Sequence, residues 1–239
     1  MNEELKQRWI LIGKKMPSLF LGFFLFAIAI LLTLHSNLGM SPWDVLHIGI
    51  VKHSDFTLGQ VSEIVGFFIL LLACFLGTIP GLGSVCNMIF IGVFIDVINN
   101  FNIFKTPETL FGRIVMLVVG VLIMGWATYF YLRVELGAGP RDGLMEGLVK
   151  KINKPLWMIR GTIEMTALIV GYFLGGPVGV GTLITAFTIG FSVQWAFKIG
   201  KYDSRNASHM NMIDLYKYLT MRDVTSNDSC TNTNQNLTK

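Results

Sequence analysis

The chain has 239 residues and a net charge of +4, with 52% apolar and only 14% charged residues. Its mean hydropathy is +0.58, and soluble globular proteins carry about 25% charged residues, so the composition excludes that class. We expect an all-α integral membrane protein whose first partner is the lipid bilayer. The basic excess is expected to reflect membrane topology, so no nucleic-acid partner is predicted.

Four uncharged tracts predict the membrane spans. Residues 17–34 and 114–132 are each long enough for one spanning helix of about 20 residues. Residues 64–95 and 165–197 are longer, and a run of glycine and proline interrupts each of them. Since such runs end helices, each of these two tracts predicts a pair of helices joined by a tight turn. The sequence thus predicts six spans, three in each half.

The two halves share a motif. Residues 38–46 (LGMSPWDVL) return as residues 136–144 (LGAGPRDGL), at an offset of 137 − 39 = 98 positions. A repeat of three spans crosses the membrane an odd number of times, so the second copy must be inverted relative to the first. The expected organisation is a cytoplasmic N-terminal segment, a first repeat, a connecting loop, a second repeat, and a cytoplasmic tail with a candidate amphipathic helix and a disordered end. These segments are 1–15, 16–100, 101–113, 114–199 and 200–239.

Each motif is expected to end one helix and begin a short one that is re-entrant or lies at the membrane interface. Glycine tolerates the left-handed conformation that follows a helix, and proline suits the first position of the next helix. Asp44 and Asp142 would then fall in the first turn, where a carboxylate complements the helix dipole. The structural residues of this turn are Gly39, Pro42, Gly137 and Pro140.

The two aspartates leave two interpretations open. They either cap the short helices or line a shared polar pathway for a small molecule or ion, approached from opposite sides of the membrane. Charged residues predicted inside spans are further candidates for this pathway: Glu63, and the pair Arg160 and Glu164, whose i, i+4 spacing also suits a structural ion pair. The pathway candidates are therefore Asp44, Asp142, Glu63, Arg160 and Glu164.

The first motif loop also contains a cluster of potential metal ligands. Their spacing matches no zinc pattern, so we expect no metal site and no other cofactor. Because the chain has no His-Glu-x-x-His, nucleophile-elbow or phosphate-loop motif, no enzymatic activity is predicted. The potential ligands are His35, His47, His53, Asp44 and Asp55.

Lys and Arg residues predict the orientation. They gather before the first span, between the fourth and fifth spans, and after the sixth. With six spans these three regions share one face, so the positive-inside rule places both termini in the cytoplasm.

The span pattern and the two Leu-Gly-x-x-Pro-x-Asp motifs, above all LGAGPRDGL at 136–144, resemble the YczE/YyaS/YitT family of bacterial multi-pass membrane proteins. The resemblance covers residues 16–200 and implies a location in the bacterial cytoplasmic membrane. It implies no substrate.

The predicted function is that of a small-molecule transporter or permease that works by alternating access between the inverted repeats. The alternative is a non-transporting accessory or regulatory membrane protein that uses the basic cytoplasmic loop and the tail as docking surfaces. Small-residue patterns such as Gly77-x-x-x-Gly81 favour tight packing within the bundle and leave a homodimer open.

Overall fold

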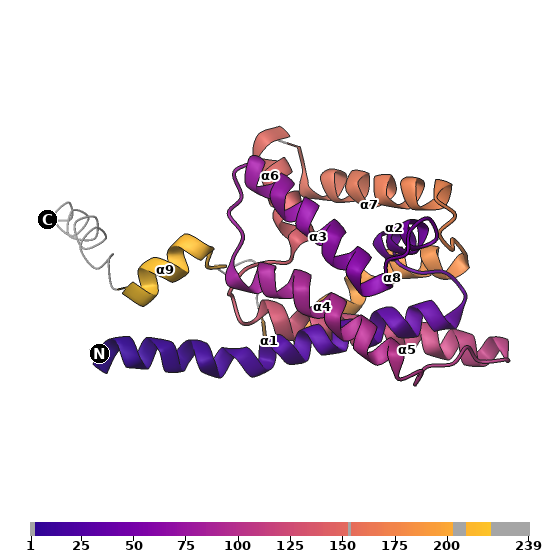
Figure 1. Cartoon of the computed structure of the whole chain (residues 1–239), viewed down its shortest axis with the longest axis horizontal. Coiled ribbons are helices and arrows are strands. Elements are labelled where there is room, and N and C mark those ends of the chain that lie inside the picture. Colours follow the sequence, from indigo (N-terminus) through magenta and orange to yellow (C-terminus); the bar gives the residue numbers. More distant parts are fainter. Residues whose placement is uncertain (1–2, 153, 203–208, 221–239) are drawn as a thin grey trace, which may run out of the picture.

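The computed structural model describes residues 3–152, 154–202 and 209–220, and in these ranges the chain forms nine helices (Figure 1). Five are long and apolar, two are short helices that begin within the repeated motif, one is a long helix with two charges, and one is a short C-terminal helix. In chain order they are α1 (Glu3–Ser36), α2 (Pro42–Val51), α3 (Leu58–Phe75), α4 (Leu82–Asn100), α5 (Leu110–Leu132), α6 (Pro140–Ile152), α7 (Leu156–Phe173), α8 (Val180–Ile199) and α9 (Met212–Thr220).

Five of the described helices, α1, α3, α4, α5 and α8, have the length and hydropathy needed to cross a membrane. The sequence predicted six spans, and the remaining one is α7. This helix has the same length as α3, 18 residues, but it carries Arg160 and Glu164, which lower its hydropathy. In Figure 1, α7 runs along the long axis of the molecule, as α1 does.

The centre of the bundle is the contact between α1 and α5. Helix α4 packs against α1, and helix α8 packs against α5. Leu19, Phe23 and Ala27 of α1 are fully buried there. The helices come close because Gly22 has no side chain: a Cβ at this position would lie 2.8 Å from the backbone nitrogen of Tyr131. Small residues at such contacts are the usual means of packing helices in a bilayer.

The helix ends follow the expected chemistry with one difference. Helices α2 and α6 begin at Pro42 and Pro140, as the motif predicts. The left-handed residue after α1 is Asn37 (φ 53°) rather than Gly39, whose φ of 116° lies two residues further along. A Cβ at Gly39 would also lie 2.6 Å from Thr182 Oγ1, so this glycine allows the loop to approach α8 closely.

The first residues of the chain continue the first span as one helix, and they meet α9. Arg8 donates a hydrogen bond of 2.6 Å to the carbonyl of Tyr218 and lies 4.7 Å from the centre of its ring. The N-terminal end of α1 and helix α9 therefore lie at the same end of the molecule (Figure 1). The short helix α9, Met212–Thr220, lies in the segment 200–239 for which a candidate amphipathic helix was expected, and the end of the tail, 221–239, lies outside the described residues.

Candidate functional site

Each short helix packs against a helix of the other half of the chain. Helix α2 packs against α7, and α6 packs against α3. Gly49 of α2 is held close to Leu174, because a Cβ there would lie 2.8 Å from the Leu174 Cβ, and Gly147 of α6 is held equally close to Leu76. Each short helix thus bridges from its own half to the other half.

The first turns of α2 and α6 meet through Trp43 and Arg141. The guanidinium carbon of Arg141 lies 4.8 Å from the centre of the Trp43 ring. This distance is within the range of a cation–π interaction, which contributes about 2 kcal/mol or more when it is shielded from water. Trp43 is 9% exposed, so the contact lies inside the protein.

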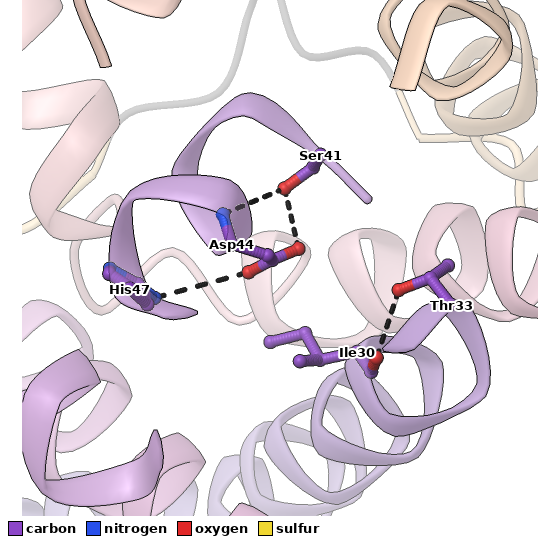
Figure 2. A network of polar contacts seen from close by, with 5 residues as sticks. All are labelled: Ile30, Thr33, Ser41, Asp44 and His47. Atoms are coloured by element: carbon purple, nitrogen blue, oxygen red, sulfur yellow. Dashed lines mark hydrogen bonds and ion pairs between the residues drawn. The ribbon is translucent and has the colours of Figure 1, made fainter. Parts of the chain in front are cut away.

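Asp44 is buried beside this contact. Its side chain is almost fully enclosed, with 1% of the residue exposed. Figure 2 shows it between Ser41 and His47. The Ser41 hydroxyl donates a 2.5 Å hydrogen bond to the carboxylate and accepts one of 3.4 Å from the Asp44 backbone. His47 Nδ1 is 4.0 Å away, too far for a hydrogen bond. Asp44 therefore completes the helix cap, and it is also a carboxylate enclosed in the protein.

Asp142 occupies the corresponding turn of α6 and has a different partner. The hydroxyl of Tyr131, on α5, donates a hydrogen bond of 3.0 Å to its carboxylate. Arg141 acts electrostatically on both Asp44 and Asp142, and also on Glu164 of α7. Arg141 is thus a cation that acts at longer range on acidic groups from three helices.

Two of the remaining predicted pathway residues, Arg160 and Glu164, lie on α7, and the charge of Arg141 acts on Glu164. The third, Glu63, lies at the edge of the bundle. Arg160 and Glu164 form an ion pair with 3.0 Å between Nε and Oε1, and their side chains are 52% and 31% exposed. Glu63 lies apart, at the contact of α3 with α4, where its side chain faces Gly92. Its acidic neighbour is Asp96, which accepts a 2.9 Å hydrogen bond from the backbone of Gly59 and so caps α3.

No group of three or more potential metal ligands gathers anywhere in the described part of the chain. Of the histidines in the first motif loop, His47 lies in the buried cluster, and His53 bonds through its ring to the carbonyl of Gly49 at 3.0 Å. Sequence analysis did not identify Tyr131 as part of the site. Its position in the uncharged tract 114–132, within α5, gives no local signal.

A cavity of about 190 Å³ opens beside α6, at the end of the molecule where α9 lies. Small residues create it: Ala138 and Gly143 line the cavity, and a Cβ at Gly143 would have no atom nearer than 3.9 Å. The first motif has Met40 and Val45 at these positions, and both are fully buried. Around α2 the corresponding space is therefore filled by side chains.

The comparisons with known proteins cover most of the chain. The family of unknown function DUF6198 matches residues 13–198. The chain belongs to this family. It is 36% identical over 180 residues to an uncharacterised protein of Haemophilus influenzae, covering 73% of this chain and 82% of the relative. It is 34% identical over 198 residues to the uncharacterised membrane protein YczE of Bacillus subtilis, covering 82% and 88%.

A second Bacillus subtilis protein, YyaS, is 25% identical over 171 residues, covering 69% of this chain and 83% of the relative. No solved structure matches. Together with the five apolar helices, these relatives make this DUF6198 member a bacterial multi-pass membrane protein. The names of the relatives assign no activity.

Proposed function

We propose that this protein is a small-molecule transporter or permease that works by alternating access between two inverted repeats, α1–α4 and α5–α8. In this proposal α7 is the sixth span, and α2 and α6 are re-entrant helices that enter from opposite faces. Both termini lie in the cytoplasm because the basic clusters, including the one between α5 and α7, then share that face.

The helix bounds and the loop contacts support the repeat. Helix α3 begins at residue 58 and α7 at residue 156, a difference of 156 − 58 = 98, and their last residues, 75 and 173, have the same offset. The backbone nitrogen of Gly83 donates a 2.7 Å hydrogen bond to the carbonyl of Leu136, and Gly181 donates one of 2.7 Å to Leu38. The two donors differ by 98 positions, and so do the two acceptors. Each bond joins one half of the chain to the other.

The contact between Trp43 and Arg141 is the observation that carries the proposal. These two residues are equivalent positions of the repeat, since 141 − 43 = 98, yet they touch. Equivalent residues of two halves meet only where a twofold axis passes between them. In the proposed arrangement Asp44, Asp142 and Arg141 lie near the axis of the two repeats, and transporters of this kind bind their substrates at the interface of the repeats.

The two halves also differ in a way that alternating access requires. In the first repeat, α3 packs tightly on α4: Gly59 lies against the carbonyl of Gly92. In the second repeat the corresponding helices are apart, and a Cβ at Gly161 or Gly190 would have no neighbour within 4 Å. We infer that this conformation is open toward the cytoplasm through the cavity beside α6, and that the exchanged conformation closes α7 on α8.

The exchange can be tested without a known substrate. Glu63 and Gly92 are in contact, and their equivalents are Gly161 and Gly190. The double variant Gly161→Cys/Gly190→Cys, in a background without native cysteines, should form a cross-link with a short thiol reagent when α7 closes on α8. Thr166→Cys/Gly190→Cys is the control, because the equivalent of Thr166 is Phe68, which is exposed at 61% and lies about 140° around α3 from Glu63.

Selective cross-linking of the first pair supports the exchange. Equal cross-linking of both pairs, or of neither, contradicts it. The alternative of a non-transporting regulatory protein predicts no exchange of this kind.

A further inference from the structure

The C-terminal segment that follows α8 is bonded to both halves of the chain. Residues 209–220, which comprise α9 and the three residues before it, are called the C-terminal strap. The backbone nitrogen of Met210 donates a 2.9 Å hydrogen bond to the carbonyl of Glu135, in the second half. That of Met212 donates one of 3.0 Å to the carbonyl of Pro80, in the first half. The strap thus joins the second motif to the turn between α3 and α4, at the end of the molecule where α9 lies (Figure 1).

The rest of the strap is anchored on α1. Helix α9 begins with a cap, in which the side chain of Asn211 accepts a 2.8 Å hydrogen bond from the backbone nitrogen of Asp214. Leu215 is 7% exposed and packs in the apolar cluster to which α1 contributes most. Arg8 of α1 also bonds to α9. The strap is therefore a folded element that is held mainly on the first half of the chain.

The other face of the repeat has no counterpart of these bonds among the described residues. The equivalents of Glu135 and Pro80 are Asn37 and Val178, since 135 − 98 = 37 and 80 + 98 = 178. In the described ranges, no backbone nitrogen donates a hydrogen bond to either carbonyl, and both residues are exposed. In the proposed orientation the strap is thus an addition to the cytoplasmic face alone.

The glycines at the two turns show the same difference. Three segments meet at Gly81, because a Cβ there would collide with the carbonyls of both Leu136 and Met210. At the equivalent Gly179, the near atoms belong to the first motif only, at residues 38–39. Glycine at position 81 therefore admits the strap against a contact between the halves that both faces share.

The strap lies on the turn of the helix pair that is closed in this conformation. Helix α3 packs on α4, whereas the equivalent α7 and α8 are apart. For α3 to separate from α4, the turn that joins them must change its shape. The bond to Pro80 and the close contact at Gly81 oppose that change. Within the described residues, the turn between α7 and α8 has no such restraint.

The docked strap also carries a cost. Nδ1 of His209 is buried and has no hydrogen-bond partner among the described residues. A buried polar atom without a partner disfavours the docked state by about tenfold or more in the docking equilibrium. Undocking returns this nitrogen to water, so the cost favours release of the strap.

We propose that the C-terminal strap is a cytoplasmic clamp on the transport cycle. It holds α3 on α4 and so stabilises the conformation in Figure 1. Its release allows α3 to leave α4 while α7 closes on α8. This clamp regulates the exchange between the two helix pairs and therefore rests on the proposed function.

Met212→Pro weakens the strap most selectively. Met212 is the first residue of α9, where proline is well tolerated, but proline has no N–H to bond to Pro80. Met212→Ala is the matched control, because it shortens the same side chain and keeps the N–H. Deletion of residues 203–239 removes the whole strap. Deletion of residues 221–239 is its control, because it removes only residues that follow α9.

The assay measures the rates of two cross-links in membranes, in a background without native cysteines. Glu63→Cys/Gly92→Cys reports the contact of α3 with α4, and Gly161→Cys/Gly190→Cys reports that of α7 with α8. Loss of one hydrogen bond in Met212→Pro should raise the second rate relative to the first about two- to tenfold. Deletion of the strap should raise the ratio further, and both controls should keep the wild-type ratio.

The outcomes separate the clamp from the transport proposal. If α7 cross-links to α8 at the same rate with and without the strap, the exchange stands and the clamp is refuted. If strap deletion weakens the link between α3 and α4 while α7 and α8 never cross-link, the clamp is supported and the exchange is refuted. No response of either pair refutes both. Equal effects of Met212→Ala and Met212→Pro refute the clamp, because they assign the effect to the side chain.

Discussion

Replacing Arg141 by methionine tests the buried cluster most severely. The substitution keeps an unbranched side chain but removes the cation that acts on Asp44 and Asp142, together with the contact to the Trp43 ring at 4.8 Å. The cation–π contact contributes about 2 kcal/mol or more when it is shielded from water, and the longer-range attraction of Arg141 to the enclosed carboxylate of Asp44 adds to it. We expect Arg141→Met to lose stability of this order.

The assay is reversible unfolding in mixed detergent, followed by helix content. Arg133→Met is the matched control: Arg133 also lies over an aromatic ring, 5.3 Å from the centre of Tyr129, but it is exposed. An exposed charge contributes about 0–1 kcal/mol. Adding Asp44→Asn to Arg141→Met should recover part of the lost stability, because it removes the uncompensated carboxylate. Equal losses in Arg141→Met and Arg133→Met, or no recovery in the double variant, would refute the reasoning.

Two further predictions follow from matched pairs of positions. Gly39→Ala should destabilise strongly, because a Cβ would collide with the first turn of α8, whereas Gly77→Ala, with φ of 89° and open space, should cost about 1 kcal/mol through its backbone alone; comparable thermal stability of the two variants would contradict the close approach. Tyr131→Phe removes a hydrogen bond to the carboxylate of Asp142 and should cost about 1.5–3 kcal/mol, whereas Tyr202→Phe removes a bond to a backbone carbonyl and should cost about 0.5–1.5 kcal/mol. Unfolding free energies of the two variants check the order, and the reverse order would show that Asp142 is not held by Tyr131.

Much of the helix pattern could be predicted from the sequence because each signal is local. Charge-free tracts and glycine-proline runs determine where helices begin and end, and Pro42 and Pro140 begin α2 and α6 as expected. The prediction for α7 was less direct, since its polar residues lower the hydropathy that identifies a span. The glycine-proline run that divides residues 165–197 predicts this crossing, and the match with the first half supports it.

The site itself depends on contacts between the halves, and local patterns do not contain that information. Asp44 and Asp142 were predicted from their motif, but the contact of Trp43 with Arg141 depends on how α2 and α6 cross between the halves. Glu63 was selected because a charge in a span is costly, yet it faces Gly92 at the wall of the bundle. The same holds for any ionisable residue in a span. The sequence shows that the residue lies within the membrane, but it does not show which neighbouring helix the side chain faces.

The measurement that tests the central claim most directly is the accessibility of one matched pair of positions. Val45→Cys and Gly143→Cys are equivalent in the repeat, and each is introduced into a chain that lacks Cys74, Cys86 and Cys230. A membrane-impermeant thiol reagent is applied to intact cells and to inside-out vesicles. We expect Gly143→Cys to react from the cytoplasmic side only, and Val45→Cys to resist that reagent from the same side. Reaction of both positions from one face would contradict the inverted repeat and the transport mechanism built on it.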